Sequence, residues 1–191
     1  MNNPRRAERL YDLEIRRNLT RNYVPLLFHG MLGQTGFRLV NAPTFLPAYI
    51  LMLSDGSNFM VGLALSLQAL GMVLTPMFGA TLIEHRKRVL PIGFLAGGLM
   101  RGSVLLIALA GFFLEGKATL YAILFSLLLL GMFSGIQGVI FNFLNSKVIP
   151  VNQRGRLTGL RNFLAGLISA LVAWAGGEYL IGEVPTAEGY F

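Results

Sequence analysis

The sequence predicts an all-α, multi-pass membrane protein, and three observations support that fold class. Apolar residues make up 54% of the 191 residues and charged residues only 13%, about half the charged fraction of an ordinary globular domain. The mean hydropathy is +0.61. Uncharged runs of 28 residues after Asp55 and 29 residues after Lys117 exceed the roughly 20 residues with which a helix crosses a bilayer core.

Five transmembrane helices are expected, at about residues 23–53, 57–83, 89–114, 118–145 and 157–181. A basic N-terminal segment, residues 1–22, precedes this bundle, and a short tail, residues 182–191, follows it. The first span is long for one crossing and contains Pro25, Pro43 and Pro47. We therefore expect it to be tilted or kinked in its second half, with a broken or partly re-entrant segment as the alternative.

The distribution of basic residues predicts the orientation of the bundle. Thirteen of the sixteen lysines and arginines fall on one side: six in the N-terminal segment, three in the turn at residues 86–88, and four in the predicted loop between the last two spans. The other side has Lys117 and five acidic residues. Because basic residues concentrate on the cytoplasmic side, we expect a cytoplasmic N-terminus, an extracytoplasmic tail and a location in the cell membrane.

Glycines spaced four residues apart predict close packing between helices. Such pairs occur at Gly93 and Gly97, at Gly98 and Gly102, and at Gly131 and Gly135. Small residues at this spacing lie on one helix face and let a neighbouring backbone approach.

Other classes of function are disfavoured by what the chain lacks. It has no cysteine, which excludes a thiolate metal site and a cysteine nucleophile. The formal net charge of +7 would suggest nucleic-acid binding, but the basic residues flank apolar runs, so membrane topology explains them. No His-Glu-x-x-His motif or pair of acids lies within a span. We expect no enzyme activity, cofactor or metal.

Two predicted cytoplasmic loops carry motifs. Residues 79–88 read GATLIEHRKR, and residues 148–162 read VIPVNQRGRLTGLRN. With the short external turns, these loops resemble the N-terminal half of a major facilitator superfamily transporter, although the acid of the first motif stands one position later than is usual in that family. The matching residues are Gly79, Glu84, Arg86, Arg88, Arg154 and Arg156.

The resemblance implies a bundle of twelve helices in two halves that transports a small solute by alternating access. The bilayer and the solute would be its partners. This chain would be the N-terminal part, and the missing C-terminal half or a partner chain would complete it. The alternative is a five-span interaction or scaffold subunit without transport activity.

Polar residues inside the spans predict where solute binds. Gln34, Arg38 and Asn41 follow i, i+4, i+7 spacing and share one helix face. An arginine near mid-bilayer costs about 2.5–3.5 kcal/mol on insertion scales, so it normally faces a cavity or a partner. In the family resembled, the first and fourth helices line the central cavity. We expect these residues and Gln137 to contact the solute, with Arg38 favouring an anionic group.

Two alternatives apply to these assignments. Arg38 could pair instead with backbone carbonyls or with an acid in the missing half. In the loops, Glu84 could pair with Arg154 or Arg156 and hold one access state closed, or the basic residues could only set the topology.

Overall fold

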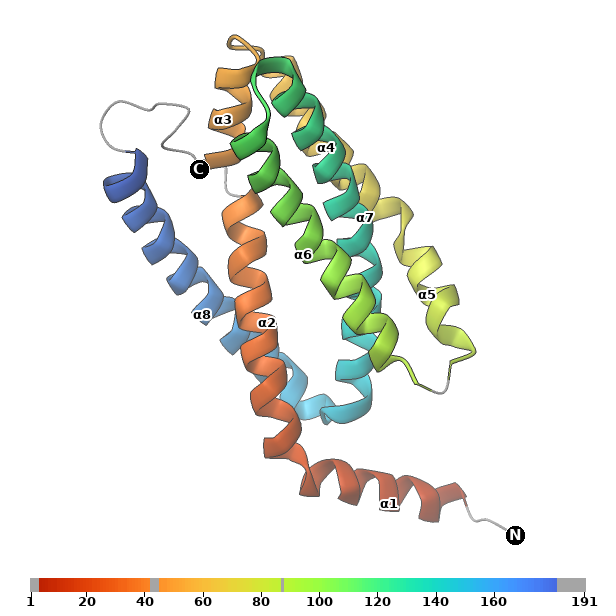
Figure 1. Cartoon of the computed structure of the whole chain (residues 1–191). Helices are drawn as coiled ribbons and strands as arrows, with labels where there is room; N and C mark the ends of the chain where they lie inside the picture. Colours follow the sequence, from red (N-terminus) through yellow and green to blue (C-terminus); the bar gives the residue numbers. More distant parts are fainter. Residues whose placement is uncertain (1–3, 42–44, 87, 182–191) are drawn as a thin grey trace. The chain divides into compact units, whose positions relative to one another are not determined.

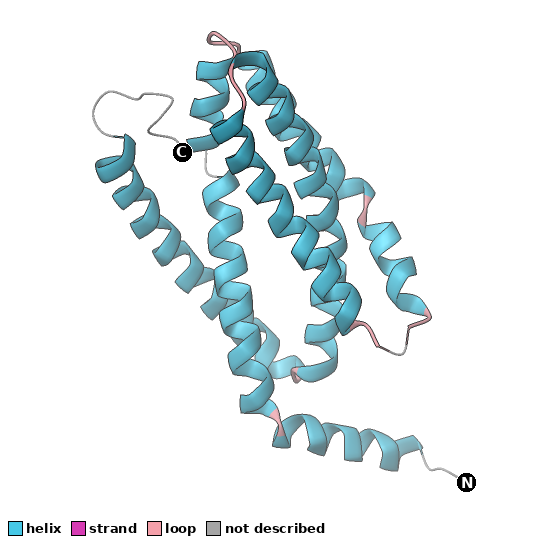
Figure 2. Ribbon diagram, in the orientation of Figure 1, coloured by secondary structure: helices cyan, strands magenta, loops and turns pink. Residues whose placement is uncertain are grey.

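The computed structural model describes residues 4–41, 45–86 and 88–181, and every regular element in these ranges is helical (Figure 2). The elements are α1 (Pro4–Arg17), α2 (Leu19–Asn41), α3 (Phe45–Leu53), α4 (Asn58–Leu74), α5 (Pro76–Glu84), α6 (Leu90–Phe113), α7 (Gly116–Val148), α8 (Val151–Gly176) and a π-helical turn, Gly177–Ile181. The all-α fold class is confirmed. The predicted tail at residues 182–191 lies outside the described residues.

Four helical stretches are long and apolar enough to cross a membrane: Asn58–Glu84, Leu90–Phe113, Gly116–Val148 and Val151–Tyr179. They coincide with the second to fifth predicted spans. The first predicted span contains α2 and α3, with the undescribed residues 42–44 between them. The 23 residues of α2 extend about 34 Å, but this helix is too polar to be among the four. A first crossing by α2 and α3 stays a prediction.

The connection between α7 and α8 is shorter than predicted. Only Ile149 and Pro150 lie between the two helices. The prediction that Arg154 and Arg156 lie in a loop is wrong, because both are residues of α8. Arg161 was counted with that loop but lies within the predicted fifth span, and it also belongs to α8. Pro150 has no backbone N–H and cannot continue α7, whereas the residues after it are free to start a new helix at once.

The chain divides into two compact units, of which the first comprises Met1–Leu39 and Phe143–Trp174. It contains α1, most of α2, the last turns of α7 and most of α8. Helices α2 and α8 lie side by side in this unit (Figure 1). Helix α1 turns away from the N-terminal end of α2 (Figure 1).

The second unit comprises Val40–Asn142 and Ala175–Phe191. Its core is built around α7, whose Ile123 and Leu127 are fully buried. Ile50 of α3 and Ala64 of α4 pack in the same cluster, and Ile107 of α6 packs against it. Helix α7 therefore organises this unit.

Helix α4 approaches α7 closely because both helices carry glycine at the crossing. A Cβ added at Gly71 would lie 2.6 Å from the backbone nitrogen of Met132, and a Cβ at Gly131 would overlap the carbonyl oxygen of Gln68. The Gly131 and Gly135 pair packs as predicted. Nothing lies within 4 Å of a Cβ at Gly98 or Gly102, so the described chain does not use that pair for close packing.

The stretch Asn58–Glu84 is broken about two thirds of the way along, at Thr75 and Pro76, where α4 ends and α5 begins. Pro76 cannot donate the hydrogen bond that would continue the helix. The Thr75 hydroxyl lies 2.8 Å from the Gly71 carbonyl and 2.7 Å from the Met132 carbonyl of α7. Its single proton serves these two acceptors, so the break is tied to the partner helix.

Substituting Gly131 with alanine is predicted to destabilise the protein. The added methyl group meets the backbone of α4, which cannot move as a flexible side chain would. Overpacking of this kind costs about 1–3 kcal/mol. The measurement is the denaturant midpoint of unfolding for the purified protein in detergent, monitored by circular dichroism.

The matched control is Gly138→Ala on the same helix, where a Cβ meets nothing within 4 Å. Its midpoint should be unchanged or slightly higher, since alanine is the better helix former. Equal midpoints for the two variants would contradict the close approach of α4 and α7.

Candidate functional site

The predicted solute-binding face of α2 lies partly against α8. The guanidinium of Arg38 contacts Gly166 of α8, where a Cβ would lie 3.0 Å from Nη1. The side chain of Arg161 on α8 contacts Gly30 of α2 in return. Each helix therefore offers a glycine to an arginine of the other. Glycine at both positions leaves room for the two long side chains to lie between the helices.

Helices α2 and α8, which pack together at Arg38, contain no acid. None of residues 15–39 and 143–174 of the first unit is aspartate or glutamate. Arg38 is exposed and has no hydrogen bond or ion pair with a residue that the structure describes in this unit. A guanidinium without a carboxylate partner creates a positive local potential, which favours an anion.

The other predicted residues of this face are less informative. Gln34 is half-buried on α2. Asn41 is the last residue of that helix, and its side chain lies outside the described part of the chain. Arg38 is therefore the residue of this predicted face whose side chain the structure describes as exposed.

Gln137 lies in the second unit and is brought together with Arg101. Both side chains converge on Gly97 of α6, where a Cβ would lie 3.0 Å from Arg101 Nη1 and 3.4 Å from Gln137 Nε2. Arg101 donates to the Gly97 carbonyl over 2.9 Å. The buried Oε1 of Gln137 has no hydrogen-bond partner among the described residues. Within this unit, Gln137 therefore lies near Arg101, whose side chain is hydrogen-bonded to α6.

The residues of the first loop motif have separate roles. Gly79 is buried, and a Cβ there would lie 3.1 Å from the Cα of Ile136 on α7, so this glycine serves packing. Glu84 is the last residue of α5 and is exposed, as are Arg86 and Arg88. Lys87 lies outside the described residues. The exposed charges are available for contacts at this end of the helix.

The C-terminal end of α7 is capped from three other helices. The last four carbonyls of a helix have no partner within it. Here the Ser146 carbonyl accepts from Arg154 Nη2 over 2.7 Å, and the Lys147 carbonyl accepts from the Tyr11 hydroxyl over 2.6 Å. Asn145 and Val148 accept from Ile149 N and Asn22 Nδ2.

Arg154 is held by this end of α7. Its Nε donates to the Ile149 carbonyl over 3.0 Å, in addition to the bond to Ser146. A cation also favours the negative end of a helix dipole. Arg156, two residues along α8, is exposed. The structure thus separates two arginines that the sequence motif grouped: Arg154 joins α7 to α8, and Arg156 projects away.

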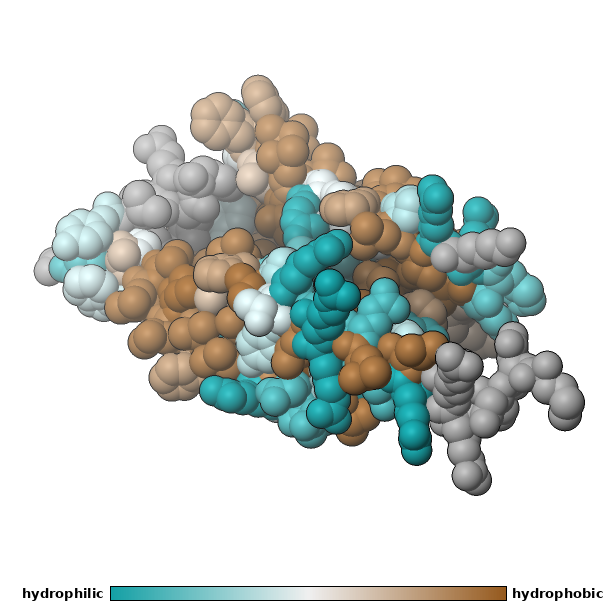
Figure 3. Space-filling view, turned by 90° about the horizontal axis from the view of Figure 1, so that it is seen from below, coloured by the Kyte–Doolittle hydropathy of each residue, from teal (hydrophilic) through white to brown (hydrophobic). Residues whose placement is uncertain are grey.

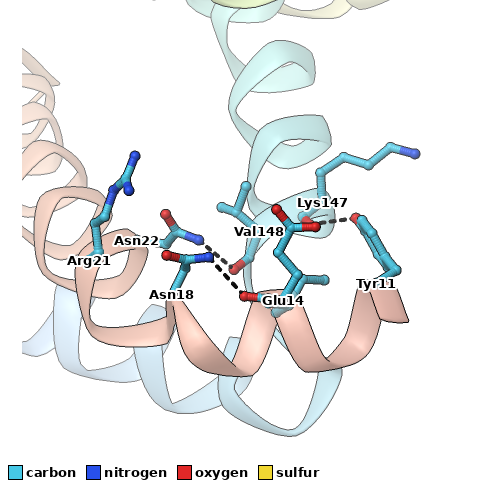
Figure 4. A pocket seen from close by; sticks show the side chains of 8 residues that line it. Tyr11, Glu14, Asn18, Arg21, Asn22, Lys147 and Val148 are labelled. Carbon is cyan, nitrogen blue, oxygen red and sulfur yellow. Dashed lines mark hydrogen bonds between the residues drawn. The ribbon is translucent and has the colours of Figure 1, made fainter. Parts of the chain in front are cut away.

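A polar groove of about 320 Å³ lies beside this capped end. It is lined by Tyr11, Glu14, Ile15, Asn18, Arg21, Asn22, Lys147 and Val148 (Figure 4). None of the predicted solute-binding residues lines it. Among the described residues, no group of three or more acidic or histidine side chains is arranged to hold a metal ion.

Sequence reasoning missed the contacts of Arg161. Its charge was counted with the basic loop, although the predicted span 157–181 includes it, and it lies eleven residues into α8. The useful signal was the distance from Pro150: a helix beginning after this proline places Arg161 three turns inside. Thr75 was also missed, although a Thr-Pro pair within an uncharged run indicates a helix break.

Comparison with known families assigns the chain to a class of membrane protein. Residues 18–185 match the Major Facilitator Superfamily, so the chain belongs to this family of membrane transporters, which are not enzymes. We found no significant match among curated proteins or among solved structures. The protein is integral to a membrane, where it contacts the lipid bilayer and a solute.

Replacing Arg154 with glutamine is predicted to loosen the junction of α7 and α8. The substitution removes two charge-assisted hydrogen bonds, and bonds of this type contribute about 1.5–3 kcal/mol each. Amide hydrogen exchange around residues 146–153 should become faster. Arg156→Gln should leave exchange unchanged. If both variants exchange at the wild-type rate, Arg154 does not cap α7.

Proposed function

We propose that this protein moves a small anionic solute across the cell membrane by alternating access, and that Arg38 binds the anion. The observation that supports this proposal is an exposed guanidinium on α2 without a partner in its unit. An arginine in an apolar region is retained only where a partner or a water-filled cavity offsets its desolvation. A transported anion is such a partner.

The chemistry of the surroundings favours an anion over other solutes. A guanidinium presents several N–H groups in a plane and binds carboxylate or phosphate oxygens in pairs. Gly166 has no side chain and so gives this group room against α8, and Arg161 of the same helix adds a second positive charge. With no acid among residues 15–39 and 143–174, a cationic solute would meet only repulsion there.

We propose the orientation from the positive-inside rule. The cytoplasmic side would hold α1 and the junction of α7 and α8, because these segments carry the clustered arginines. Helices α2 and α3 would form the first crossing. An odd number of crossings before the tail would place residues 182–191 outside the cell.

Alternating access requires helices on both sides of the solute. We propose that a second half, in the same polypeptide or in a partner chain, encloses the site together with α2 and α7. Gln34, Asn41 and Gln137 would add polar contacts. Glu84 and Arg156 are exposed, and we propose them for the cytoplasmic pair that closes one state. Arg154 suits this pair less well, because α7 already holds it.

The first test is anion uptake by vesicles that contain the protein as its gene encodes it. Labelled phosphate, succinate and lactate serve as probes. Replacing Arg38 with glutamine should lower kcat/KM for the transported anion by about 10- to 150-fold, because a hydrogen bond to a charged group contributes about 1.5–3 kcal/mol. Arg38→Lys keeps the charge but loses the planar fork, so its loss should be smaller.

The control is Lys117→Gln, which removes a charge in the first turn of α7, outside the predicted solute-binding residues. This variant should transport like the wild type. Wild-type uptake by Arg38→Gln for every transported anion would contradict the assignment of Arg38. Absence of uptake of any solute by the wild-type protein would contradict the transport proposal itself.

A further inference from the structure

The polar groove beside the end of α7 is lined by charges of both signs. Arg21 of α2 lies on one side of it and Glu14 of α1 on the other (Figure 4). Both side chains are exposed, and neither forms an ion pair with a residue that the structure describes. Because the Tyr11 hydroxyl donates to the Lys147 carbonyl over 2.6 Å, this side of α1 is turned toward the bundle. A molecule that enters the groove therefore meets both charges.

Hydrogen-bond acceptors gather between these two charges. Asn18 Nδ2 donates to the Glu14 carbonyl over 3.0 Å, and Asn22 Nδ2 donates to the Val148 carbonyl over 3.5 Å. These bonds leave the two amide oxygens and the Glu14 carboxylate without a donor among the described residues. A primary ammonium carries three N–H groups and no acceptor. Two amide oxygens and a carboxylate suit such a group.

The cations of the groove suit a phosphate. The Arg21 guanidinium is a planar fork that binds phosphate oxygens in pairs. Lys147 adds a second cation, whose Nζ lies 5.5 Å from the centre of the Phe143 ring. Glu14 would repel a molecule that carries a phosphate but no positive group. The groove therefore favours a molecule that carries both a phosphate and a primary ammonium.

An apolar stripe on α2 begins at the groove and favours a lipid over a soluble molecule. Val24, Phe28 and Leu32 are 42%, 55% and 62% exposed. They follow Arg21 at i+3, i+7 and i+11, so all four residues share one side of the helix. Gly30, which α8 contacts, stands nine residues after Arg21 and so lies on the opposite side. We call the three apolar residues the α2 stripe, and it offers a surface for acyl chains.

We propose that the groove binds the headgroup of phosphatidylethanolamine. The phosphate contacts Arg21 and Lys147, the ammonium contacts Glu14 and the amide oxygens of Asn18 and Asn22, and the acyl chains lie along the α2 stripe. Seen from the α1 end, hydrophilic side chains cover much of the surface, with hydrophobic ones between them (Figure 3), as expected at the level of lipid headgroups. The assignment to the cytoplasmic leaflet rests on the orientation proposed above.

Lipid binding to the full protein in detergent tests this site by native mass spectrometry. The protein is titrated separately with phosphatidylethanolamine, phosphatidylcholine and phosphatidylglycerol of the same acyl chains. Phosphatidylcholine has a quaternary ammonium without N–H groups, and phosphatidylglycerol has no ammonium. Phosphatidylethanolamine should bind about 5- to 10-fold more tightly than either, as expected for one additional charge-assisted contact in an exposed groove.

Two variants separate the two halves of the headgroup. Arg21→Gln should weaken the binding of all three lipids, because each carries the phosphate. Glu14→Gln should weaken phosphatidylethanolamine alone, bring it to the level of phosphatidylcholine, and strengthen phosphatidylglycerol. Asp12→Asn and Arg16→Gln are the matched controls, since they remove the same charges at exposed positions of α1 outside the groove. Both controls should bind the three lipids as the wild type does.

The comparison of three lipids on the wild-type protein needs no variant. Equal affinity for all three overturns the proposal, and so does tighter binding of phosphatidylglycerol than of phosphatidylethanolamine. Wild-type selectivity in Glu14→Gln overturns the assignment of the ammonium. Competition by soluble glycerophosphoethanolamine at the concentration of the lipid itself overturns the role of the acyl chains. The outcome is independent of the uptake assay: a protein without anion uptake can keep this lipid selectivity, and loss of the selectivity leaves the assignment of Arg38 unaffected.

Discussion

A polar group inside an apolar bilayer must find its partner within the protein, and this constraint governs most of the structure. Backbone groups meet it by forming helices. Side chains meet it by bonding to carbonyls of their own helix, as the Ser103 hydroxyl does to Leu99 and the Arg101 guanidinium to Gly97. Thr35 does the same to Met31. Arg38 differs from these residues, because its guanidinium has no such bond to a described residue of its unit.

Close helix packing follows from the same constraint. Lipid is as apolar as leucine, so helices in a membrane gain little from burying apolar surface and associate through tight packing and hydrogen bonds. The crossing of α4 and α7 uses both, since Gly71 and Gly131 remove the side chains and Thr75 supplies a bond between the helices. Pro76 leaves the Met72 carbonyl without its usual donor, and this oxygen lies against Gly135. The glycines and the helix break therefore both contribute to the close packing of α4 against α7.

The sequence predicted the features that a helix must show along its own length. Two uncharged runs and two further apolar stretches predicted the four long apolar helices, because a crossing needs about 20 mostly apolar residues. The glycine pair on α7 indicated a packing face. The limits of α8 were predicted less well, because a basic cluster on a helix resembles a basic loop when only composition is read.

Contacts between helices could not be predicted in the same way. Spacing along α2 placed Gln34 and Arg38 on one face, but nothing in that spacing indicated that Gly166 of α8 would lie beside Arg38. Family resemblance grouped Gln137 with Arg38, whereas within its own unit Gln137 meets Arg101 at Gly97. The role of Arg154 could not be predicted without knowing the last residue of α7. Each of these contacts joins residues distant in the sequence, and periodicity within one helix carries no information about them.

The central claim is that Arg38 faces a water-filled path and binds a transported anion there. The most direct measurement is the reaction rate of Arg38→Cys, the sole cysteine in an otherwise cysteine-free chain, with a charged, membrane-impermeant methanethiosulfonate. The account predicts reaction in intact membranes, and slower reaction when the transported anion is present at a concentration high enough to offset its weaker binding to this variant. No reaction until the protein is denatured would contradict it, since position 38 would then be sealed in protein or lipid.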